Sequence, residues 1–130
     1  MIVGLDHVQV AAPEGCEDEA RAFHGGLLGL AELDKPELLA ARGGVWFGLG
    51  QQQLHVGVAA AFAPATKAHP ALRASAAAAL ERIVERLEAS GASVSRPDPA
   101  ELPGTVRAFV SDPWGNRIEL VASAGTRVFT

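Results

Sequence analysis

Short stretches in which apolar and polar residues alternate recur through both halves of the chain, and they predict β-strands. Prolines and glycines separate these stretches and predict turns between them. The strands expected in the first half cover residues 2–11, 31–34, 44–49 and 52–58. The strands expected in the second half cover residues 69–74, 92–96, 105–110 and 116–121.

Helical spacing of apolar residues replaces this alternation once in each half. One helix is predicted over residues 17–28, behind an acidic first turn, with His24 on its solvent-facing side. A second helix is predicted over residues 76–90, capped by Ser75 and ended by Gly91. The apolar positions that recur at this spacing are Ala20, Phe23, Leu27, Leu80, Ile83, Val84 and Leu87.

The order of elements is therefore the same in both halves, and it predicts an α+β fold built from two βαβββ modules. The modules are expected at residues 1–58 and 69–130, joined by an alanine-rich linker at residues 59–68. Sequence identity between the two halves is low, so the repeat lies in the order of the elements rather than in the residues themselves. At 130 residues the two modules are expected to form one domain.

Composition and charge argue against several classes of function. With 48% apolar and 20% charged residues, the chain is typical of a soluble globular protein, and no apolar stretch predicts a membrane span. The formal net charge of −4, without a cluster of lysines and arginines, argues against a nucleic-acid partner. The first residues lack the basic and apolar regions of a signal peptide. The single Cys16 rules out an internal disulfide and fits a cytoplasmic protein, and its acidic neighbours make it a poor nucleophile.

Two pairs of potential metal ligands lie at nearly the same spacing, one pair in each predicted module. His7 and His55 belong to the first and fourth strands of the first module, and His69 and Glu119 to those of the second. A duplicated unit that brings both pairs to one axis would form a site of three imidazoles and one carboxylate. Because these groups suit Zn, Ni, Fe(II), Co or Mn, the pattern predicts a site for one divalent metal.

The alternation within each strand predicts which side chains share the face of the sheet away from the helices. If Val8 and Val10 pack against the helices, His7 and Gln9 point the other way. The same parity places on this face Gln53, His55, His69, Arg73, Arg117 and Glu119. Trp46, Phe47 and Phe109 are candidates for an apolar wall, depending on the local register. We expect the substrate contacts to come from Gln9, Gln53, Arg73, Arg117, Trp46 and Phe109. The alternative role of the two arginines is an ion pair with a buried carboxylate, and that of the two glutamines is to orient the imidazoles.

Three segments also carry a family resemblance. Leu5-Asp6-His7-Val8-Gln9-Val10 looks like a characteristic first strand, and residues 21–30 look like the helix-to-turn segment that follows it. The most specific segment is Ser111-Asp112-Pro113-Trp114-Gly115-Asn116-Arg117-Ile118-Glu119-Leu120, a closing turn and strand. Together these segments resemble the vicinal oxygen chelate superfamily of glyoxalases, bleomycin-resistance proteins and type I extradiol dioxygenases.

The resemblance implies paired βαβββ modules that form an incomplete barrel around a metal. In that family the ligands come from the first and fourth strands of each module. Carried over by position, it implies His7, His55, His69 and Glu119 as ligands, with Glu119 also a candidate catalytic base. Members are commonly dimeric, so the resemblance further implies a homodimer.

Departures from the family pattern narrow the expected reaction. The sequence contains no tyrosine, which disfavours the extradiol dioxygenase reaction, and His55 stands where glyoxalase I-like enzymes have a glutamate. Only 5% of the residues are aromatic, which disfavours metal-free bleomycin binding. We expect a metal-dependent lyase, isomerase or transferase that chelates neighbouring oxygens of a small metabolite or xenobiotic. The alternative is a metal-independent protein that sequesters a small molecule in the same place.

Overall fold

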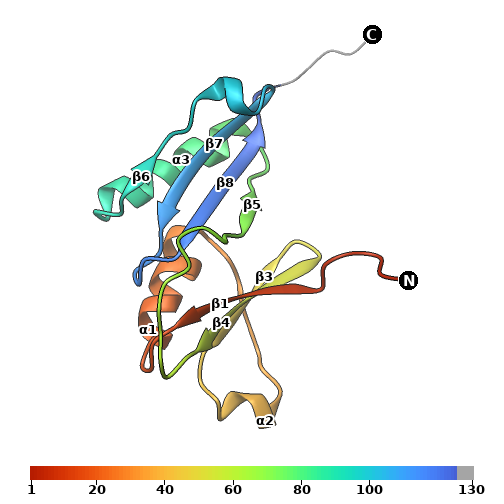
Figure 1. Ribbon diagram of the computed structural model, residues 1–130, viewed down its shortest axis with the longest axis vertical. Helices are drawn as coiled ribbons and strands as arrows, with labels where there is room; N and C mark the ends of the chain where they lie inside the picture. Colours follow the sequence, from red (N-terminus) through yellow and green to blue (C-terminus); the bar gives the residue numbers. More distant parts are fainter. Residues whose placement is uncertain (126–130) are drawn as a thin grey trace. The chain divides into compact units, whose positions relative to one another are not determined.

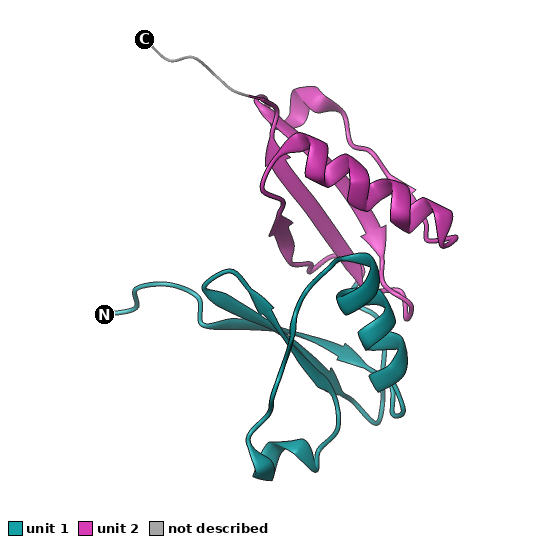
Figure 2. Cartoon of the chain, turned by 180° about the vertical axis from the view of Figure 1, so that it is seen from behind, with its two compact units in different colours: residues 1–65 teal, residues 66–130 magenta. Residues whose placement is uncertain are grey.

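The computed structural model describes residues 1–125 and divides the chain into two compact units. The first unit is Met1–Ala65 and the second begins at Thr66, as the two colours of Figure 2 show. Each unit contains one four-stranded mixed sheet and its own helices. Within residues 1–125, no helix is long and apolar enough to cross a membrane.

In the first unit, the first strand pairs in parallel with the fourth, and the remaining pairs are antiparallel. The order across the sheet is β1-β4-β3-β2, so β4 lies between β1 and β3. Figure 1 labels these three strands. The strands are β1 (His7–Ala12), β2 (Glu32–Leu33), β3 (Val45–Leu49) and β4 (Gln52–Val58). The helices are α1 (Glu17–Ala20), which continues into the π-helix η1 (Arg21–Leu27), and α2 (Glu37–Ala40).

The second unit repeats this topology with the sheet order β5-β8-β7-β6. Its strands are β5 (Ala71–Arg73), β6 (Val94–Ser95), β7 (Thr105–Ser111) and β8 (Arg117–Ser123). Its helices are α3 (Ala77–Ala89) and the 3₁₀-helix η2 (Pro99–Glu101). The predicted α+β fold with a βαβββ order in each half is therefore confirmed, with α2 and η2 as additions that the sequence pattern did not predict.

The predicted starts of two elements were wrong. The first strand begins at His7 rather than at Ile2, because His7 lies opposite Gln53 and β4 begins only one residue earlier, so the residues before Asp6 have no partner on β4. Ser75 does not cap α3, whose N-cap position is Ala76 with no side-chain hydrogen bond. The predicted end of that helix at Gly91 is confirmed, since Gly91 has a φ of +88°, which favours glycine.

One face of each sheet packs against the helices and forms the core. In the second unit, α3 buries Leu80, Val84 and Leu87 against a sheet face that carries Ile118 and Leu120. Burial of side chains of this size contributes about 1.5–3 kcal/mol each to stability. The opposite face, away from the helices, is called the open face below.

Phe47, one of the candidates for the apolar wall, belongs to the core of the first unit and not to the open face. It lies opposite Leu54 on β4, so both side chains point towards the helices, and both are fully buried. Its neighbour Trp46 therefore points to the open face and is only half-buried.

His24 is also buried, contrary to the prediction that it faces solvent. His24 lies four residues after the buried Ala20 and next to the buried Phe23, so it belongs to the core-facing side of the helix. The imidazole packs against Phe23 and Phe47, at ring-centroid distances of 5.0 and 5.4 Å. Neither ring nitrogen has a hydrogen-bond partner among the described residues, and burial lowers the pKa of His24 to about 4.

Replacing His24 with leucine, which is similar in volume, should raise the free energy of unfolding at pH 7 by about 1 kcal/mol, because two buried unpaired nitrogens are removed. The gain should grow at acidic pH. The unfolded chain takes up a proton near pH 6.5, whereas the folded imidazole does so only near pH 4. Stability owed to neutral His24 is therefore complete above pH 6.5 and lost progressively down to pH 4.

The full loss is on the order of 3 kcal/mol, since each tenfold change in proton affinity is worth about 1.4 kcal/mol. Urea unfolding of the wild type and of His24→Leu, at pH 7 and at about pH 4.5, measures this difference. All other titrating groups are shared by the two proteins and cancel in the comparison. An equal pH dependence in both proteins would contradict the burial of an uncharged His24.

Candidate functional site

The parallel strand pair of each unit brings one pair of the predicted ligands together on the open face. Gln9 lies opposite His55, so His7 is two residues before the position that faces His55. Ala71 lies opposite Glu119, so His69 is likewise two residues before the position that faces Glu119. The offset is the same in both units, which explains the similar spacing of the two pairs in the sequence.

In the first unit, His7 and His55 stack on one another. Their ring centroids are 4.2 Å apart with an interplanar angle of 16°. Trp46, directly opposite His55 on β3, stacks on His55 at 4.0 Å and 3°. Because β4 lies between β1 and β3, the His55 ring is held between His7 and Trp46.

Polar neighbours fix both of these imidazoles. Asp6 Oδ1 lies 2.8 Å from His7 Nδ1, which leaves His7 Nε2 as its outward nitrogen. His55 Nε2 lies 2.8 Å from Gln53 Oε1. Burial, with a smaller contribution from the neighbouring His7, lowers the pKa of His55 and keeps its ring neutral.

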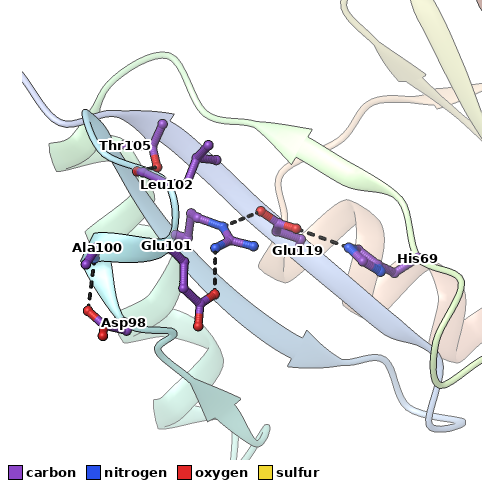
Figure 3. Close-up of polar contacts among 8 residues, drawn as sticks. His69, Asp98, Ala100, Glu101, Leu102, Thr105 and Glu119 are labelled. Carbon is purple, nitrogen blue, oxygen red and sulfur yellow. Dashed lines mark hydrogen bonds and ion pairs between the residues drawn. The ribbon is translucent and has the colours of Figure 1, made fainter.

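In the second unit, His69 and Glu119 meet directly. His69 Nε2 lies 3.1 Å from Glu119 Oε1 (Figure 3). His69 Nδ1 lies 2.9 Å from the backbone carbonyl oxygen of Lys67. Both partners of the ring are hydrogen-bond acceptors. The position between His69 Nε2 and Glu119 Oε1 is therefore one that a proton or another cation can occupy.

The other carboxylate oxygen of Glu119 is held by Arg107, a residue that the sequence reading missed. Arg107 Nε donates to Glu119 Oε2 at 2.8 Å, and Arg107 Nη1 donates to Glu101 Oε1 at 3.3 Å. Arg107 is the main cause that lowers the pKa of Glu119, so this buried carboxylate is ionised. The signal was present in the sequence, because Arg107 and Phe109 alternate with the apolar Ala108 and Val110.

The other predicted substrate contacts divide between the two units. A cleft of about 530 Å³ in the first unit is lined by His7, Gln9, Trp46, Gln53 and His55, together with the cations of Lys35 and Arg42. In the second unit, the guanidinium carbon of Arg117 lies 3.9 Å from the centre of the Phe109 ring. Within residues 1–125, neither Arg73 nor Arg117 forms an ion pair with a carboxylate, so the alternative role considered for them is not observed.

The turn before β8, the most specific segment of the resemblance, is held by a buried aspartate. Asp112 Oδ1 accepts hydrogen bonds from the backbone N–H groups of Trp114 and Asn116 at 3.0 and 2.8 Å. A family model described as the glyoxalase/bleomycin resistance protein/dioxygenase superfamily matches residues 4–120.

The chain belongs to this superfamily.

Solved structures of this superfamily show the same fold. A protein of the glyoxalase family from Bacillus anthracis is 47% identical, covers 95% of this chain and 97% of its own, and gives a TM-score of 0.86. The fosfomycin resistance protein FosX from Listeria monocytogenes is 18% identical, with coverages of 97% and 94% and a TM-score of 0.75. Lactoylglutathione lyase from Agrobacterium tumefaciens is 20% identical, with coverages of 93% and 94% and a TM-score of 0.70. The similarity to FosX and to lactoylglutathione lyase, at 18–20% identity, shows the fold alone. No curated protein matches the chain.

The donor chemistry of this superfamily member fits a divalent metal, but the two pairs differ in geometry. Nε2 of His69 and Oε1 of Glu119 converge, and an ion can take the place of the proton between them. A metal lies in the plane of each imidazole that binds it, about 2.1 Å from the nitrogen. The planes of His7 and His55 are stacked and nearly parallel, so no point lies within bonding distance in both. Within each unit, the described residues form no cluster of three or more candidate ligands.

Replacing Arg107 with glutamine should raise the pKa of the Glu119 carboxyl, because the charge and the Nε donor that stabilise the ionised form are lost. Carboxyl ¹³C NMR titration of Glu119 measures the change. Glu101→Gln is the matched control. Glu101 contacts Arg107 but not Glu119, so the control should move the titration far less. An unchanged pKa in Arg107→Gln would show that the ion pair is not formed in solution.

Proposed function

We propose that this superfamily member is a metal-dependent enzyme of the glyoxalase type, a lyase, isomerase or transferase acting on a small molecule with neighbouring oxygens. The observation that carries the proposal is the His69–Glu119 pair. Its donor atoms lie 3.1 Å apart, and the remaining polar atoms of both side chains are held by Lys67 and Arg107. A preorganised imidazole–carboxylate pair of this kind is typical of first-row metal sites.

The chemistry of a structural neighbour supports the same reading. A variant of FosX from Listeria monocytogenes was crystallised with Mn(II) and 1S,2S-dihydroxypropylphosphonic acid, a compound with hydroxyl groups on adjacent carbons. This neighbour is 19% identical to the chain, and we extend its metal and its class of substrate to the chain as part of the proposal.

We propose His7, His69 and Glu119 as the protein ligands of one divalent ion, chosen from Zn, Ni, Fe(II), Co and Mn. Two imidazoles and one carboxylate leave coordination positions open for substrate. His55, predicted from the sequence as a fourth ligand, is proposed instead as a positioning residue. Its ring stacks on His7 and is itself held by Trp46 and Gln53, so it restricts the orientation of the His7 imidazole.

Each polar neighbour of the proposed ligands has a defined part. Asp6 holds Nδ1 of His7, and the Lys67 carbonyl holds Nδ1 of His69, so both rings keep Nε2 for the metal. Arg107 keeps Glu119 ionised, which favours its role as a ligand over the role of base also expected from the sequence. When bound, the metal would polarise the chelated oxygens and stabilise negative charge on them. We propose that Gln9 and Trp46, which line the cleft of the first unit, contact the substrate.

Metal analysis by mass spectrometry tests the ligand set, on protein purified without chelator or immobilised nickel. The wild type should carry about one divalent ion per chain, and His69→Ala should lose it together with any activity. His55→Phe keeps a flat ring between His7 and Trp46 and should retain the metal stoichiometry. Loss of the metal in His55→Phe would restore His55 as a ligand. Full occupancy in His69→Ala would overturn the proposed site.

Absence of any metal, with none taken up from added Zn, Ni, Mn or Fe(II), would favour the alternative of a metal-independent binding protein. Under that alternative, a bound small molecule should stabilise the protein equally with and without chelator. Under our proposal, the chelator should remove the stabilisation.

We further propose that the chain is a cytoplasmic homodimer. β1 is an edge strand of the first sheet and β5 is an edge strand of the second, and exposed edges of this kind need cover. Light scattering at micromolar concentration should therefore give twice the mass of one chain. A mass equal to that of one chain would contradict the proposal.

A further inference from the structure

The open face of the second sheet carries an excess of positive charge. The register places Phe109 opposite Glu119 and Ser111 opposite Arg117, so these side chains share one face. Arg107 and Arg73 both lie opposite Val121 and share that face too. Three arginines thus accompany one glutamate on the paired strands, in a chain whose formal net charge is −4. A positive region on an acidic protein attracts anions selectively.

The arginines of this face differ in their partners. Arg107 is committed to Glu119 and Glu101. Arg117 is half-buried, and within the described part of the chain no carboxylate pairs with it. Its guanidinium carbon lies 3.9 Å from the centre of the Phe109 ring, which is stacking distance. A guanidinium that stacks through its face keeps the N–H donors at its edge available for an oxyanion.

Phe109 contacts both Arg117 and one of the proposed metal ligands, His69. The same ring that carries Arg117 contacts the imidazole of His69, with a centroid distance of 5.5 Å and an interplanar angle of 75°. Arg107, which holds Glu119, also approaches this ring, at 5.3 Å. Arg117 is therefore held next to the His69–Glu119 pair on a rigid aromatic support.

We propose that Arg117, supported by Phe109, binds an anionic group of the substrate whose neighbouring oxygens bind the metal. This inference rests on the proposed function and narrows it to small oxygenated molecules that carry a carboxylate, phosphate or phosphonate group. The planar fork of a guanidinium matches two oxygens of each of these groups. Arg73 is exposed on the adjacent β5 and adds positive charge without a stacking support.

The test uses the full chain in the presence of a chelator, so that binding to a metal cannot contribute. The probes are methylphosphonate, a tetrahedral anion, and acetate, a planar one, followed through the arginine Nε–H signals in ¹⁵N NMR. The Arg117 signal, assigned by its absence from Arg117→Gln, should shift on titration. The affinity of Arg117→Gln should be at least about tenfold weaker, a loss of roughly 1.4 kcal/mol.

Two further variants make the result specific. Arg82→Gln removes one exposed arginine from α3 and should bind the probes as the wild type does. Arg117→Lys keeps the charge but loses the fork and should bind with intermediate affinity. The dispersion of the amide signals of each variant reports whether it is folded.

Absence of any Arg117 shift in the wild type at high millimolar probe, or equal affinity in folded Arg117→Gln, would overturn the inference. Tighter binding of methylphosphonate would support it for a tetrahedral group, and tighter binding of acetate for a carboxylate. Failure of the proposed function shows separately, as absence of metal in the chelator-free protein. A protein that binds metal but no probe retains the proposed function and loses this inference.

Discussion

Parallel pairing of the first strand of each unit with its fourth strand is the constraint on which the rest of the structure depends. The two strands are far apart in the sequence, and a helix and two further strands connect them. The pairing places His7 beside His55 and His69 beside Glu119 with the same offset. A slip of one residue would turn one member of each pair into the core. The buried Leu54 and Leu120 therefore maintain the register that the open face requires.

The same register produces two chemically different pairs. In the first unit the contact is a stack of aromatic rings, in which His55 is enclosed by His7 and Trp46. In the second unit His69 contacts one carboxylate oxygen of Glu119, and Arg107 binds the other. A carboxylate donor converges with an imidazole, whereas two stacked imidazoles do not converge. The duplicated architecture thus provides one pair whose ligand atoms converge, His69 with Glu119, and one pair in which the His7 ring is restricted by stacking on His55.

Burial makes the arginine partner of Glu119 necessary. A carboxylate in the sheet without a cation would lose much of its hydration without compensation, and its pKa would rise. Arg107 supplies the cation from the neighbouring strand and uses one donor on Glu101 in the adjacent η2 segment. His24 shows the opposite solution, since no described residue compensates its nitrogens and the ring remains neutral. The two residues show that a buried group keeps its charge where the fold supplies a partner of opposite charge, as for Glu119, and stays neutral where it supplies none, as for His24.

Alternation and helical spacing were enough to predict both βαβββ orders and the open-face positions of Gln9 and Arg117. These features are local, because a strand has a period of two and a helix a period near four whatever the surroundings. The family followed from the resemblance of three sequence segments to it. The start of β1 and the core position of Phe47 depended on strand pairing, and the burial of His24 depended on the packing of its helix against Phe47. The link from Arg107 to Glu119 and the stacking of His55 also needed the tertiary structure. Such contacts join residues from different strands, and only the register and the packing of the sheet decide which side chains meet.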